Sequence, residues 1–126
     1  MDLWIGVVTD ELDELNELNA IVSGLPQWID SGSGYMLRPS AIAHFLYENA
    51  DCDTLQRMCC TADKFVKGEK IFLIGHILHS TCPPSVYFWI MPYGDLCAYF
   101  RDRGDNSSYS KDVLVKMLIN HLSTVY

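Results

Sequence analysis

The spacing of apolar residues along this chain follows two different periods. Four segments repeat their apolar residues every three or four positions, which is the period of an amphipathic helix. These segments are 10–24, 39–49, 53–67 and 111–125. Pro39 and Ser110 favour helix starts, Gly68 favours a helix end, and either Asp51 or Asp53 can cap the third helix. The first half of the chain is therefore predicted to be mainly helical.

Four other segments are short apolar runs rich in β-branched and aromatic residues, which is typical of buried strands. They span 3–8, 70–79, 85–91 and 96–100. Turn-forming residues separate the last three, at Cys82-Pro83-Pro84 and at Pro92-Tyr93-Gly94-Asp95. We therefore expect an α+β fold. Its mainly antiparallel sheet consists of a short N-terminal strand and a three-stranded C-terminal meander, with about four helices packed on it.

Length and composition predict a single domain over residues 1–126. A chain of this length with 49% hydrophobic residues has enough apolar surface for one core. No basic leader precedes an apolar stretch, and no apolar run approaches the ~20 residues of a membrane span. The five cysteines cannot all pair within the chain, because their number is odd. Together these features predict a cytoplasmic protein without a membrane segment.

The negative charge of the chain is concentrated at its N-terminal end. The first 37 residues hold seven carboxylates and no lysine or arginine, which accounts for the whole formal net charge of −7. From Arg38 onward, acidic and basic residues are equal in number. An acidic element repels nucleic acid and attracts basic surfaces. Nucleic-acid binding is therefore the least favoured class of function.

Helical spacing places four of these carboxylates on one face of the first helix: Asp10, Asp13, Glu14 and Glu17. No lysine stands among them to offset their mutual repulsion. The grouping does nothing for the stability of the helix, which favours a role in binding a basic partner protein. Trp28 and Asp30, in the loop that follows, are further candidates for this interface, since tryptophan is enriched at binding hot spots.

One cluster of residues has the side chains that a zinc site requires. His76, His79 and Cys82 offer imidazole and thiolate ligands, and Cys97 on the third meander strand is the nearest candidate for a fourth. However, residues three apart on a strand point to opposite faces, so His76 and His79 are not expected to meet at one ion. We therefore predict no metal and no cofactor, and keep these four residues as weak candidates only.

The sequence lacks the common motifs of catalysis. It contains no Gly-x-Ser-x-Gly turn, no phosphate-binding glycine loop and no dinucleotide fingerprint. Cys59 is expected in the core, with the adjacent Cys60 on the flank of the same helix. We therefore do not expect an enzyme.

The leading hypothesis is a small intracellular binding protein that engages a basic partner, for example a nuclease toxin. An immunity protein, an antitoxin or a phage-type inhibitor would act in this way, because charge complementarity sets encounter rate and specificity. Two alternatives stay open. One is a small enzyme, or a ligand- or metal-binding domain, with a pocket between the meander and the helices. The other is a homodimeric structural protein that pairs through a sheet edge or through the last helix.

Overall fold

The computed structural model of the chain describes residues 16–61, 69–80, 82–105 and 107–125. In this part of the chain the fold is mainly helical, with seven helices and a single two-stranded hairpin, at 68% helix and 4% strand. The predicted α+β class is therefore wrong. Three of its four expected strands are helical, and the fourth lies outside the described residues.

The first described element is a helical segment at 16–23. A short antiparallel hairpin follows, in which β1 (Ile29–Asp30) pairs with β2 (Met36–Leu37). The other elements are α2 (Pro39–Asn49), α3 (Cys52–Thr61), α4 (Lys70–His79), α5 (Pro84–Tyr87), the short 3-10 helix η1 (Phe88–Ile90), α6 (Tyr93–Arg101) and α7 (Lys111–Val125). None of the described helices is long and apolar enough to cross a membrane.

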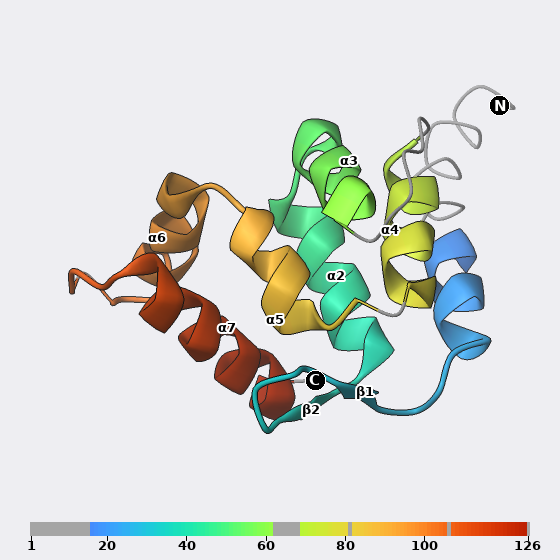
Figure 1. The fold of residues 1–126 in the computed structure, drawn as a ribbon, viewed down its shortest axis with the longest axis horizontal. Coiled ribbons are helices and arrows are strands. Elements are labelled where there is room, and N and C mark those ends of the chain that lie inside the picture. Colours follow the sequence, from blue (N-terminus) through green and yellow to red (C-terminus); the bar gives the residue numbers. More distant parts are fainter. Residues whose placement is uncertain (1–15, 62–68, 81, 106, 126) are drawn as a thin grey trace, which may run out of the picture.

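Helix α2 lies between α4 and α7 and contacts both (Figure 1). Helices α3 and α4 contact each other, α6 contacts α7, and the hairpin contacts α7 through β2. The aromatic centre of the core joins three of these elements. Phe45 of α2 meets Phe88 of η1 and Tyr99 of α6 edge-to-face, with ring centroids 5.6 and 5.0 Å apart. Such aromatic pairs contribute about 0.5–1.5 kcal/mol each beyond the burial of their surface.

Segments 70–79, 85–91 and 96–100 form helices in place of the predicted meander. Helix α4 covers the first, α5 and η1 cover most of the second, and the third lies within α6. The prolines that suggested turns stand at helix starts, because Pro84 is the first residue of α5 and Pro92 directly precedes α6. A short run that is apolar on nearly every side has no polar period to distinguish a strand from a helix.

The other predicted helices are confirmed where the structure describes them. Helix α2 has the predicted bounds, α3 begins directly after Asp51, and α7 begins directly after Ser110. The first helix ends at Ser23, before Gly24, as expected. Its predicted start, the predicted strand at 3–8 and the continuation of the third helix beyond residue 61 lie outside the described residues.

Candidate functional site

Glu17 is the one member of the predicted acidic face that lies within the described residues. It is exposed on the helical segment 16–23. Ile21 stands one helical turn after Glu17, so the two side chains lie on the same side of the segment. Asp10, Asp13 and Glu14 lie outside the described residues, and the face that they are expected to share with Glu17 stays a prediction.

Trp28 and Asp30, the two other predicted interface residues, are both exposed. Trp28 has 40% of its surface exposed, and the guanidinium carbon of Arg38 lies 5.0 Å from the centroid of its ring. Asp30 accepts a hydrogen bond of 2.9 Å from the backbone N–H of Gly32. Trp28 is therefore accessible to a partner, whereas the carboxylate of Asp30 also stabilises the hairpin loop.

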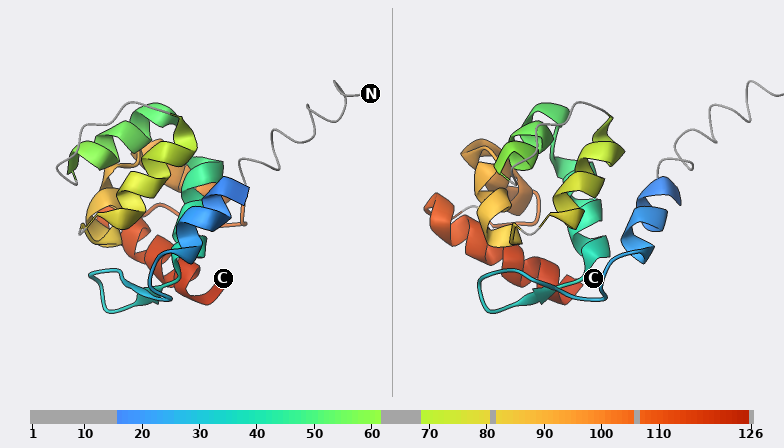
Figure 2. Two further views of the ribbon diagram at one scale, coloured as in Figure 1. Left: turned by 90° about the vertical axis from the view of Figure 1, so that its right-hand side faces the viewer. Right: turned by 45° about the vertical axis from the view of Figure 1, so that its right-hand side comes forward.

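A hollow of about 420 Å³ opens between the helical segment 16–23 and α4, which run side by side (Figure 2). Ile21, Phe72, Gly75, His76 and His79 line it. The two helices approach closely at Gly75, where an added Cβ would lie 3.3 Å from Cδ1 of Ile21. Phe72 is 64% exposed, and its ring lies 6.0 Å from that of His76, between centroids.

A second hollow, of about 430 Å³, continues along the end of α4. Its lining consists of Gly24, Leu25, Pro26, Trp28, Ile29, Leu78, His79 and Ser80. His79 lines both hollows, so they lie next to each other along α4. We call the two hollows together the α4 groove. Its walls are mainly apolar, and the exposed rings of Phe72 and Trp28 belong to its two hollows.

The helical structure of α4 changes the argument about the four weak metal candidates. His76 and His79 lie three residues apart on a helix, so they share one face and do not point to opposite faces of a strand. Cys82 follows α4 in the connection to α5, and Cys97 lies on α6. Across the described ranges, no three histidine, cysteine, aspartate or glutamate side chains come together as a group that could hold a metal ion.

Two cysteines have clear local roles. Cys59 of α3 is 1% exposed, as expected for a core residue, and its thiol donates to the backbone carbonyl of Leu73 across 3.6 Å. The thiol of Cys97 on α6 raises the pKa of the Tyr93 phenol, whose hydroxyl donates to the backbone carbonyl of Tyr109 at 2.5 Å. The side chain of Cys60 lies outside the described residues.

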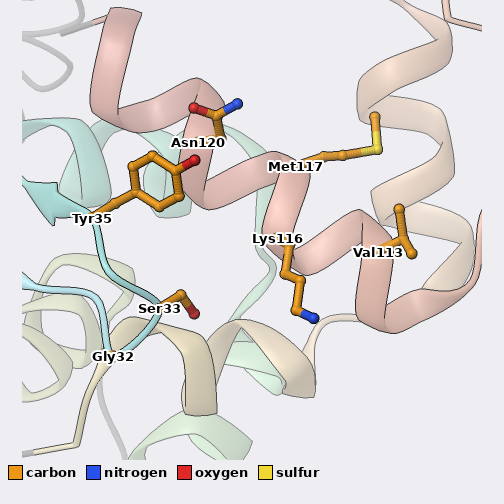
Figure 3. Close-up of a pocket in the computed structure, with 7 residues that line it drawn as sticks. All are labelled: Gly32, Ser33, Tyr35, Val113, Lys116, Met117 and Asn120. Carbon is orange, nitrogen blue, oxygen red and sulfur yellow. The ribbon is translucent and has the colours of Figure 1, made fainter.

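A third hollow, of about 530 Å³, lies between the hairpin loop and α7 (Figure 3). Its lining residues are Gly32, Ser33, Tyr35, Val113, Lys116, Met117 and Asn120. The ammonium group of Lys116 is already paired with the carboxylate of Asp112, at 3.2 Å. These lining residues include no carboxylate, imidazole or thiol, and their titratable side chains are Tyr35 and Lys116.

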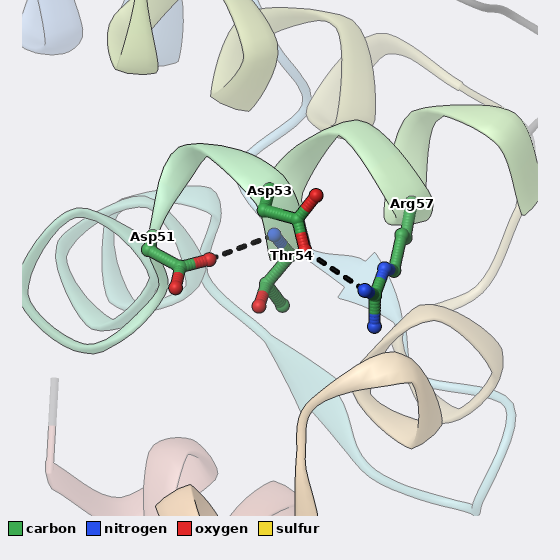
Figure 4. Close-up of polar contacts among 4 residues, drawn as sticks. All are labelled: Asp51, Asp53, Thr54 and Arg57. Carbon is green, nitrogen blue, oxygen red and sulfur yellow. Dashed lines mark hydrogen bonds and ion pairs between the residues drawn. The ribbon is translucent and has the colours of Figure 1, made fainter.

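Two carboxylates at the start of α3 have structural partners (Figure 4). Asp51 accepts a hydrogen bond of 2.8 Å from the backbone N–H of Thr54, which caps the helix. Asp53 forms an exposed ion pair of 2.9 Å with Arg57, one turn further along. Both carboxylates therefore stabilise α3 and do not form an acid–base pair.

Phe72 is the candidate residue that the sequence analysis missed, because the strand interpretation of 70–79 gave it no distinct role. Phe72, His76 and His79 are separated by four and three residues, which is helical spacing. The imidazole rings of His76 and His79 make one face of the segment more polar than its other faces. That pattern was the available evidence for an accessible helix face.

No protein family, no characterised protein and no solved structure significantly matches this chain.

Proposed function

We propose that this chain is a small acidic binding protein that engages a basic surface of a partner protein, in the manner of an immunity protein, an antitoxin or a phage-type inhibitor. One observation carries the proposal: the exposed carboxylate of Glu17 and the open α4 groove lie on the same side of the helical segment 16–23. Apolar anchors with charged groups beside them are the usual composition of a protein-binding surface.

The charge of the chain indicates the chemistry of the partner. All the net negative charge lies in the first 37 residues, which include the segment that forms one wall of the α4 groove. A complementary partner carries lysines and arginines at its binding surface. Nucleases and other proteins that bind phosphate backbones have such surfaces, and an acidic protein that covers one blocks the access of nucleic acid to it.

The first experiment compares the wild type with a variant that combines Asp10→Asn, Asp13→Asn, Glu14→Gln and Glu17→Gln. Each is immobilised and exposed at low salt to a purified basic nuclease toxin, and retained protein is eluted with increasing salt. We expect the wild type to retain the nuclease, to release it as salt rises because exposed charges are screened, and to inhibit its activity.

A matched control separates the position of the charges from their number. The control variant combines Glu48→Gln, Asp53→Asn, Asp102→Asn and Asp112→Asn, which neutralise four exposed carboxylates on α2, α3, α7 and the end of α6. This control variant loses as much negative charge as the first variant, and we expect it still to bind the nuclease. Equal retention by all three proteins, with circular dichroism showing that each is folded, would contradict the proposal.

A further inference from the structure

Helix α4 is apolar on almost every side, yet one stripe of it has no cover among the described residues. Ile71, Leu73, Ile74, Ile77 and Leu78 are buried in the core. Phe72 is 64% exposed and lines the α4 groove together with His76 and His79. A helix that is apolar all round is normally buried on all sides. Phe72 is thus a large apolar side chain that stays exposed on a mostly buried helix, next to the half-buried His76 and in line with the exposed His79.

Carboxylates stand at one end of this stripe. Glu17 precedes Ile21 by one turn, and Glu69, exposed at the start of α4, precedes Phe72 by three residues. Figure 2 shows that the helical segment 16–23 and α4 run in the same direction, so both carboxylates belong to the same end of the groove. The nearby Lys70 is directed away from them, because its ammonium donates to the backbone carbonyl of Tyr47 at 2.7 Å.

The other end of the groove combines partial negative charge with a cation. The helical segment ends before Gly24, and α4 ends before Ser80, and both of these residues line the second hollow. The C-terminal end of a helix carries a partial negative charge from its unpaired carbonyls. Arg38 is a cation near this end, and it stacks on the ring of Trp28. The end of the α4 groove at Glu17 and Glu69 is therefore the end that is complementary to positive charge.

We propose that the α4 groove binds an amphipathic helix of the basic partner. The apolar stripe of that helix covers Phe72, Ile21 and Gly75, and its lysines or arginines lie beside Glu17 and Glu69. A groove between two neighbouring helices accepts a third helix, a recurring mode of peptide recognition, and α4 is about 15 Å long. A second copy of this chain is disfavoured in the groove, since each copy has a net charge of −7.

This inference rests on the proposed function, and three synthetic helical peptides of equal length test it. The first has leucines on one face and lysines on the other. The second has serines in place of the leucines, and the third has glutamates in place of the lysines. Fluorescence anisotropy gives the dissociation constant of each. We expect the leucine–lysine peptide to bind about tenfold more tightly than the serine–lysine peptide, because only its apolar stripe fills the groove.

Variants of exposed aromatic residues test whether the difference in affinity between the two lysine peptides arises in the α4 groove. Phe72→Ser should abolish the preference for the leucine–lysine peptide, and Phe72→Ala should reduce it. Trp89→Ser is the matched control, because Trp89 on η1 is 46% exposed and does not line the groove. It should leave the preference unchanged.

The outcomes separate the inference from the proposed function. If wild type binds both lysine peptides equally, or Phe72→Ser keeps the full preference, the helix-in-groove inference is overturned while charge-driven binding stands. If the leucine–glutamate peptide binds as tightly as the leucine–lysine peptide, the requirement for a basic partner is overturned, and the proposed function fails with it.

Discussion

At the scale of single residues, the hairpin loop is held by contacts that leave no space for a side chain at Gly32. Its φ of +83° lies in the left-handed region, and an added Cβ would stand 2.6 Å from Oγ of Ser85 and 3.1 Å from Cβ of Pro83. The backbone N–H of Ser85 donates to the carbonyl of the buried Ser31 at 2.9 Å, which joins the loop to the start of α5. Gly34 has a similar φ of +88° but open space around it.

These two glycines make a controlled comparison. Gly34→Ala should lower the free energy of unfolding by about 1 kcal/mol, the cost of a left-handed backbone for an L-residue. Gly32→Ala should lower it by about 2–4 kcal/mol, since steric overlap adds to the same backbone cost. Urea unfolding of both variants measures the difference. Equal losses would mean that the loop does not pack against α5 as the structure shows.

Asp51 is a residue whose effect on stability depends on pH. Its hydrogen bond from the backbone N–H of Thr54 holds the pKa of the carboxyl below its ordinary value of 3.8. The folded protein therefore takes up the proton at lower pH than the unfolded chain. The stabilisation from the ionised cap is complete above the unfolded pKa and is lost as pH falls through the folded pKa.

Asp51→Ala should lower the free energy of unfolding by about 1 kcal/mol at neutral pH, because a helix cap is removed. Asp51→Asn keeps an acceptor for Thr54 and should cost less, while it removes the loss of stability at acidic pH. Asp53→Ala is the control, since its exposed ion pair with Arg57 contributes at most about 1 kcal/mol. Urea unfolding at neutral and acidic pH checks all three variants. A cost for Asp53→Ala as large as that for Asp51→Ala would exclude the assigned cap.

At the scale of elements, α4 provides the sharpest test of the fold. On a strand, Phe72 and Ile74 would point to the same face, because side chains alternate. On the observed helix Ile74 is fully buried and Phe72 is mainly exposed. Ile74→Ala should therefore lower the free energy of unfolding by about 2–5 kcal/mol, whereas Phe72→Ala should change it by about 0.5 kcal/mol or less. Similar losses for both variants in chemical denaturation would favour the strand.

The helices that were predicted correctly have one polar and one apolar face. In α2, buried Ile42, Phe45 and Leu46 recur at helical spacing, while Glu48 is exposed. Because apolar and polar residues recur here with the period of a helix, the sequence alone is sufficient to predict the helix. Prolines and aspartates at the starts of α2 and α3 then define where those helices begin.

The elements from α4 to α6 could not be assigned in the same way. Helix α4 packs against α2 and α3 and is enclosed on most sides, so its apolar residues carry no clear period, and only the spacing of Phe72, His76 and His79 indicated a helix. The acidic face was predicted from charge and helical spacing, whereas Phe72 became a candidate only once α4 was known to be helical. Burial is a property of the whole fold, and local sequence does not encode it completely.

At the scale of the whole molecule, charge and apolar surface contribute to different steps of the proposed binding. Excess charge at one end of the chain acts over roughly a Debye length, about 8 Å at physiological salt, and orients a basic partner before contact. The α4 groove acts only at contact, where Phe72 and Ile21 lose water. Association and dissociation rates should therefore respond to different residues of the same face.

Kinetic measurements with the leucine–lysine peptide test this division. The variant with four neutralised carboxylates should lower the association rate constant about tenfold at low salt and change the dissociation rate constant little, because steering acts before contact. Phe72→Ser should raise the dissociation rate constant about tenfold and leave association nearly unchanged. Stopped-flow fluorescence at two salt concentrations resolves both constants. If Phe72→Ser slows association instead, the apolar contact of Phe72 already forms in the rate-limiting step of association, and the division between charge and groove is wrong.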